Sequence, residues 1–425
     1  MTNQDKVLSK TLKIVNGKLL RNVEDVASIE NLVEILKKKG YIEKNIIDTK
    51  IYSREEKLVE HEILKYIIHS GEYTESMAYD VNELSLKMAL DLVDERVYAY
   101  DLLPHNFTFH NGNWFLYDFD SFQLKPEKVI TEIRGFFKII FSNYEILRLI
   151  SRKELGHYYL TRYRIEDIFH IIPFHRWLYL FANQTVCNIL FKMKQYKLIY
   201  KYLKNLFNKY SKNHKKHYYE YQNNTDFSII NELIKQNDIS SIFYIGETAS
   251  NLAINASKSE ITAQKLVYID NYDICDSYYN YVKKEEIKDI IPAVLYPLVD
   301  DKEIKKEYKY RALYDSYAQE RFYSDSVIYL EEEINENIIE QLVIFTKKIL
   351  VLKSTQKTDE YATLLNRFFT DIEITNEYLI AKNKIDNKIP VANRPYKDGN
   401  RGPDAHRQTW EVLKLLQNKK SITNN

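Results

Sequence analysis

Three polar side chains, Asp101, Asn106 and Asp118, have types and spacings that suit chemistry on a phosphate. Asp101 and Asn106 begin and end the segment DLLPHN, and Asp118 follows twelve residues after Asn106 in the segment YDFD. Magnesium takes hard oxygen ligands, so the amide of Asn106 and the carboxylate of Asp118 are a suitable pair of metal ligands. A carboxylate at Asp101 would orient or deprotonate an acceptor hydroxyl. The spacing therefore predicts magnesium-assisted phosphoryl transfer, with Asp101 as the catalytic residue.

The elements expected around these residues are those of a kinase-like domain. Residues 81–94 have the apolar spacing of a helix, and residues 106–109 and 114–117 form two aromatic-rich strands joined by the turn 110–113. Kinase-like folds place a base first, an asparagine five residues later and a second carboxylate after a short hairpin. The competing interpretation is that Asp101 starts a loop, Asn106 satisfies a turn and Asp118 ends a strand.

A glycine-rich phosphate loop is not recognisable before these residues. The only glycines among residues 1–60 are Gly17 and Gly40. Lys50, with Glu60 or Glu62 downstream, is a candidate phosphate lysine with its acidic partner, and an ordinary surface lysine is the more common alternative.

The remaining pattern of the first half predicts an α+β domain with a largely helical second lobe, over residues 1–207. Residues 8–22 form a hairpin around Asn16–Gly17, and residues 29–39 form a helix that ends at Gly40. Helical periodicity then runs from residue 127 to about 210, with one long amphipathic helix over 185–207.

A second domain is expected after a polar and basic linker at residues 208–226. Short apolar runs at 241–245, 265–269, 326–330 and 349–352 alternate with helical or irregular segments. That rhythm predicts an α/β, Rossmann-like domain over residues 227–385, with a mostly parallel sheet. Residues 386–425 hold several prolines and glycines in a polar context and form a tail.

Residues 88–94, 100–106 and 115–122, with Gly112, resemble a bacterial two-domain family. Its members join an N-terminal kinase-like region, similar to aminoglycoside phosphotransferases, to a C-terminal class I methyltransferase, and some are of nodulation type. The resemblance covers residues 8–383 and is clearest over 85–125. It implies an S-adenosylmethionine-dependent methyltransferase-like domain in the second half and a small-molecule or glycan acceptor for the first.

The predicted S-adenosylmethionine site is the turn YIGETASN, in which Gly246 and Glu247 are the cofactor-binding residues. Such sites need glycines after the first strand and an acidic residue that ends the second strand, where Asp270 would contact the ribose. One glycine stands where two or three are expected, so Thr248 or Ala249 would place a side chain against the cofactor. The family's histidine pair after the fourth strand is replaced by residues 329–333, YLEEE. An ordinary strand-end residue is the competing interpretation of Asp270.

Composition narrows the partners and the compartment. The 425 residues favour two domains, and the 61 basic and 60 acidic side chains show no basic excess that would favour nucleic acid. The N-terminus lacks the pattern of a signal peptide, and no apolar run approaches the roughly 20 residues that span a bilayer. Two distant cysteines, Cys187 and Cys275, fit a reducing cytoplasm.

Three functional hypotheses follow from the sequence. The first is phosphoryl transfer from ATP with Mg²⁺ to a small-molecule or glycan hydroxyl at the N-terminal site. The second is an S-adenosylmethionine-dependent methyltransferase in which the kinase-like half is a scaffold. The third is a non-catalytic pseudoenzyme that binds a partner.

Overall fold

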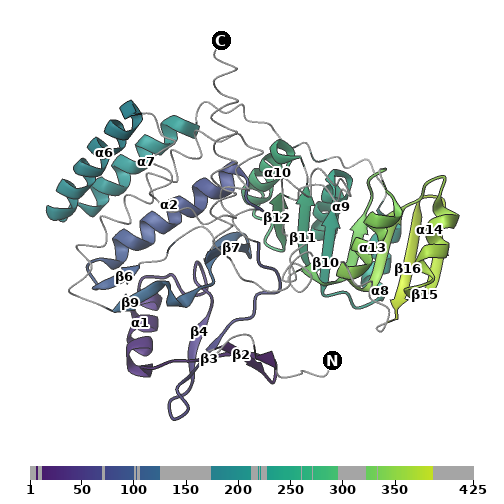
Figure 1. Ribbon diagram of the computed structural model, residues 1–425, viewed down its shortest axis with the longest axis horizontal. Coiled ribbons are helices and arrows are strands. Elements are labelled where there is room, and N and C mark those ends of the chain that lie inside the picture. The colour runs from purple at the N-terminus through teal and green to yellow at the C-terminus, as the bar shows by residue number, and fades with distance from the viewer. Residues whose placement is uncertain are drawn as a thin grey trace.

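A computed structural model (Figure 1) describes residues 6–7, 12–68, 72–99, 102, 106–124, 174–211, 219, 221, 227–259, 261–269, 271–294, 322–332 and 334–385. Asp101, Asp270, most of the predicted linker and the predicted tail lie outside these ranges. Within them, no helix is both long enough and apolar enough to cross a membrane.

The first half begins with a five-stranded antiparallel sheet in the order β1-β2-β3-β5-β4. Its strands are β1 (Lys6–Val7), β2 (Leu12–Val15), β3 (Lys18–Asn22), β4 (Thr49–Ser53) and β5 (Leu58–His61). Asn16 and Gly17 join β2 to β3 with positive φ angles of 50° and 75°, which is the conformation that a two-residue hairpin turn requires. The predicted hairpin is therefore confirmed.

Helix α1 (Val26–Lys38) lies between β3 and β4 in the chain. Asp25 caps it by accepting a hydrogen bond from the backbone N–H of Ser28 at 3.1 Å. Gly40, with φ +73°, follows the helix as predicted. The helix begins three residues before the predicted start because this cap, and not the apolar spacing, sets its first turn.

Helix α2 (Glu75–Leu92) leads into two short strand pairs. Strand β6 (Val97–Ala99) pairs with β9 (Phe122–Leu124), and β7 (Phe107–His110) pairs with β8 (Asn113–Leu116). The second pair confirms the aromatic hairpin, and a 3-10 turn at Phe119–Ser121 follows it.

The long helix predicted over 185–207 is wrong. The chain instead forms α6 (Phe174–Lys192) and α7 (Tyr196–Ser211). Lys194 takes a left-handed conformation with φ +56°, and the N–H of Gln195 bonds back to the carbonyl of Leu190, which ends α6. The break lets α7 fold back on α6 and reach α2.

The second half holds a seven-stranded mixed sheet in the order β12-β11-β10-β13-β14-β16-β15, which confirms an α/β architecture there. Its strands are β10 (Ser241–Ile245), β11 (Gln264–Ile269), β12 (Ile290–Val294), β13 (Ser324–Tyr329), β14 (Thr346–Lys353), β15 (Phe369–Ile374) and β16 (Tyr378–Lys384). Strands β10 to β14 run parallel, and β16 runs antiparallel to both of its neighbours. Counted along the chain from β10, the spatial order is 3-2-1-4-5-7-6.

The connecting helices are α8 (Ser228–Gln236), α9 (Glu247–Lys258), α10 (Tyr272–Lys284), α13 (Glu336–Phe345) and α14 (Thr358–Leu365). Every residue of β10, β12 and β13 is buried, as expected for parallel strands that are covered on both faces.

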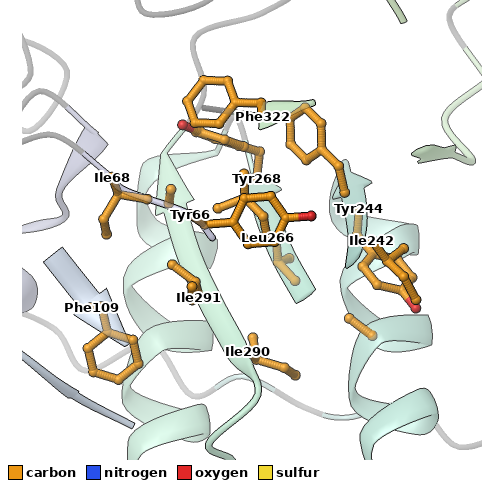
Figure 2. Close-up of a cluster of buried hydrophobic side chains, with 14 of the residues drawn as sticks. Tyr66, Ile68, Phe109, Ile242, Tyr244, Leu266, Tyr268, Ile290, Ile291 and Phe322 are labelled. Atoms are coloured by element: carbon orange, nitrogen blue, oxygen red, sulfur yellow. The ribbon is translucent and has the colours of Figure 1, made fainter. Parts of the chain in front are cut away.

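The two halves share packed side chains. Tyr66, Ile68 and Phe109 from the first half lie beside Ile290 and Ile291 of β12 in Figure 2. The Tyr66 hydroxyl is 2.7 Å from Oγ of Ser324. Trp114 of β8 donates to the hydroxyl of Tyr279 of α10 at 2.9 Å, so polar bonds reinforce this apolar contact. The domain boundaries stay a prediction.

Candidate functional site

Strand β3 brings an arginine to the turn that carries Asp118. Nη1 of Arg21 lies 2.6 Å from Oδ1 of Asp120, and Nη2 lies 4.0 Å from Oδ1 of Asp118. The Arg21 side chain is 17 % exposed, so the guanidinium is largely screened from water. A cation from the five-stranded sheet and two carboxylates from the 3-10 turn after β8 thus form one polar centre. We name Arg21, His61, Asn106, Asp118 and Asp120 the Arg21 site.

The conformation of Asp118 is fixed by its own turn. Its side chain accepts from the backbone N–H of Asp120 at 3.2 Å, and its carbonyl accepts from the N–H of Ser121 at 3.1 Å. The side chain keeps about a third of its surface exposed. A carboxylate is therefore held rigidly at a place that solvent and ligands can reach.

Asn106, the other predicted metal ligand, lies against the same turn. It is 5 % exposed, its carbonyl accepts from the N–H of Tyr117 at 3.0 Å, and its Nδ2 donates to Oγ of Ser121 at 3.5 Å. The fold thus places Asn106 beside both ends of the segment 117–121 that carries Asp118. The predicted catalytic residue, Asp101, lies outside the described residues.

His61 extends this centre on β5. It pairs across the sheet with Leu19, its Nδ1 is 3.0 Å from Oγ1 of Thr49, and its ring centroid is 5.8 Å from that of Phe119. Burial, aided by the positive charge of Arg21, lowers the pKa of His61 from 6.5 to about 4. The imidazole is neutral near pH 7, and its buried Nε2 makes no hydrogen bond with any described residue.

Lys50, the lysine considered from the sequence, faces solvent. Its Nζ is 3.5 Å from Oε1 of Glu60 and its side chain is 58 % exposed, which is the surface-lysine alternative. Sequence reasoning missed Arg21 instead. Its signal was the Asn16–Gly17 turn, because strand alternation after that turn puts Leu19 and Arg21 on one face of β3.

No protein-family model matches the chain, and no curated protein matches it. Among the described residues, no group of three or more His, Cys, Asp or Glu side chains converges on a metal position. The two metal ligands predicted from the sequence, Asp118 and Asn106, are one carboxylate and one amide.

A second candidate site lies at the carboxyl ends of the parallel strands. Gly246 follows β10 with φ +101°, a conformation that glycine alone adopts without strain, and α9 begins at the next residue. Strand β10 lies between β11 and β13, where the order of the sheet reverses, and such switch points are where open α/β sheets bind ligands. We name the turn of residues 246–248 the crest.

Glu331 fills the crest. Its Oε1 accepts from the backbone N–H of Thr248 at 3.1 Å. A Cβ placed on Gly246 would lie 2.6 Å from both Cγ and Cδ of Glu331, and closer still to Oε1. Because Gly246 has no Cβ, the Glu331 side chain can pack against its backbone.

Of the predicted cofactor residues, Gly246 and Glu247 lie at the crest and Asp270 lies outside the described residues. Ala249 points into the core, whereas Thr248 is exposed. The carboxylate of an S-adenosylmethionine methionine moiety does not fit the α9 N-terminus as it stands, because the Glu331 carboxylate already accepts the N–H of Thr248 there.

Proposed function

We propose that the chain binds a nucleoside triphosphate with magnesium at the Arg21 site and transfers a phosphoryl group to a hydroxyl. The observation that carries this proposal is the approach of Arg21, from β3, to the carboxylates of Asp118 and Asp120. Phosphoryl transfer needs a cation for phosphate oxygens beside a carboxylate for the metal, and this geometry offers both.

The topology around the site supports the same proposal. An antiparallel sheet carries the cation on its third strand, one helix separates β3 from β4, and β5 returns beside β3. Protein kinases carry their phosphate lysine on the third strand and a metal-binding aspartate after the catalytic loop. Arginine in this place offers a planar fork of donors that binds phosphate at two points.

The side chains divide the work as follows. Arg21 would bind phosphate oxygens, and Asp118 with Asn106 would hold Mg²⁺, which neutralises charge on the phosphates when bound. Asp101 would accept the proton of the acceptor hydroxyl as that oxygen attacks the γ-phosphorus, and the nucleoside diphosphate would leave with the bridging oxygen. The family resemblance points to a small-molecule or glycan acceptor.

Thermal unfolding with ATP and Mg²⁺ tests the proposal, because a ligand that binds only the folded state raises its stability. We expect a rise in Tm for the wild type and for Glu332→Gln, which changes an exposed carboxylate outside the Arg21 site, and no rise for Asp118→Asn. Asp101→Asn should keep the rise but lose transfer of labelled phosphate. No rise in the wild type, or an undiminished rise in Asp118→Asn, would contradict the proposal.

The order of the seven-stranded sheet favours a second candidate for the other half. The order 3-2-1-4-5-7-6 with one antiparallel strand next to the edge is the order of class I methyltransferases, which supports a methyltransferase-like fold for residues 227–385. The alternative function is S-adenosylmethionine-dependent methyl transfer, with the first half as a scaffold. The position of Glu331 at the turn after β10 argues against methyl transfer. A methyltransferase-like domain that does not bind S-adenosylmethionine would fit the third hypothesis, a non-catalytic protein that binds a partner.

A further inference from the structure

We infer that Glu331 is a built-in occupant of the crest, which excludes ligands that carry a carboxylate, S-adenosylmethionine included, from the wild-type chain. This inference concerns the second half of the molecule and does not depend on the proposed nucleotide site.

Strand register places Glu331 at the crest. Ile245 of β10 pairs with Tyr329 of β13, and both strands run in the same direction. Gly246 and Leu330 therefore leave the sheet at the same level, and Glu331 is the next residue of its strand connection. A shift of one residue in this register would direct that side chain elsewhere.

The start of α9 offers a backbone donor to a carboxylate. The first turn of a helix attracts anions, because its N–H groups have no partner within the helix and its dipole is positive there. Glu331 accepts one of those N–H groups, that of Thr248, at 3.1 Å. Gly246 leaves room for the Cγ and Cδ atoms, because a Cβ there would be 2.6 Å from each of them. The space beside Gly246 and the N–H of Thr248 together accommodate a carboxylate, and the chain supplies its own.

A ligand carboxylate would meet Glu331 in the same space. Two carboxylates at contact distance cannot both stay ionised without a large penalty. The ligand must therefore displace the Glu331 side chain and give up its bond to Thr248. Glu332, the next residue, does not share this role: it is 85 % exposed and pairs with Lys353 at 3.0 Å.

Titration calorimetry with S-adenosylhomocysteine near pH 7 tests the inference on the full chain. Four proteins are compared: the wild type, Glu331→Ala, Glu331→Gln and the matched control Glu332→Ala. We expect the wild type and the control to bind equally weakly, with affinities at or below the detection limit, which then serves as the reference value. Glu331→Ala, which empties the crest, should bind at least about tenfold more tightly than the wild type, and Glu331→Gln, which removes only the charge, should fall between them.

Equal binding to the wild type and Glu331→Ala would overturn the inference, as would the absence of binding to both Glu331 variants. If Glu331→Ala fails to fold, the comparison rests on Glu331→Gln, whose side chain has nearly the same shape. A parallel melt with ATP and Mg²⁺ on each protein separates the two proposals. Loss of the nucleotide effect in all four would refute the Arg21 site and leave the crest result standing.

Discussion

In both the Arg21 site and the crest, a charged side chain lies against groups of opposite charge or partial charge. The two places differ in what a ligand would change. Arg21 lies against the carboxylates of Asp118 and Asp120. A magnesium nucleotide brings both signs of charge, so its metal can take a carboxylate while its phosphates take Arg21. At the crest, Glu331 lies against Thr248 N–H, and a carboxylate ligand brings only the charge already present. In the two proposals, the first pairing prepares a ligand site and the second closes one.

The two sites also differ in their response to acid, because the Arg21 site contains a buried histidine and the crest contains none. The native chain holds His61 neutral down to about pH 4, because burial and Arg21 lower its pKa from 6.5. Between pH 6.5 and about 4 the unfolded chain binds a proton that the native chain does not. Stability therefore falls as the pH drops through this window, by about 3 kcal/mol at its lower end.

The variant His61→Phe isolates this effect, since phenylalanine keeps a ring beside Phe119 and cannot titrate. We expect the free energy of unfolding of the wild type to fall relative to that of His61→Phe by about 2–3 kcal/mol between pH 7 and pH 4.5, measured by urea denaturation. Parallel curves for the two proteins would show that the Arg21 site does not hold the imidazole neutral. The comparison with the crest would then lose its electrostatic basis.

At the crest the corresponding test is steric. Gly246→Ala places a Cβ against Glu331 and a non-glycine residue at φ +101°. In the wild type, Gly246→Ala should lower the free energy of unfolding by about 2 kcal/mol. In the Glu331→Ala background the same substitution should lower it by only about 1 kcal/mol, because only the backbone strain then remains. A double-mutant cycle by thermal or urea unfolding measures the difference. If the losses caused by Gly246→Ala and Glu331→Ala simply add, the Glu331 side chain does not lie against the Gly246 backbone.

Local features of this fold could be predicted from the sequence. Asn16–Gly17 and the aromatic hairpin depend on residues that are adjacent in the chain, and both confirm the prediction. Four apolar runs correctly marked β10, β11, β13 and β14. Strand β12 was not predicted, because Pro292 interrupts its apolar pattern. Proline is tolerated there because β12 is an edge strand. Strand β15 escaped because most of its residues are exposed.

Long-range pairings could not be predicted in the same way. Spacing placed Asn106 and Asp118 at the two ends of one hairpin, but nothing in the sequence says that Arg21 of β3 lies beside Asp118. Likewise, the helical pattern of the sequence gives no sign of the break at Lys194 that lets α7 pack on α6 and α2. The contact of Glu331 with Gly246 depends on a strand register that no local pattern reports.

The smallest expected effect sharpens the assignment of the cation at the Arg21 site. Lys50→Met removes an exposed ammonium that pairs with Glu60 at 3.5 Å. The free energy of unfolding should therefore change by less than about 0.5 kcal/mol, and the affinity for ATP should not change. Arg21→Met removes a cation of the proposed phosphate site and should weaken ATP–Mg²⁺ binding at least about tenfold, which is about 1.4 kcal/mol. Both are measured by titration calorimetry, with circular dichroism to confirm folding. Equal effects of the two substitutions would show that charge on the sheet in general, and not Arg21 at the turn, attracts the nucleotide.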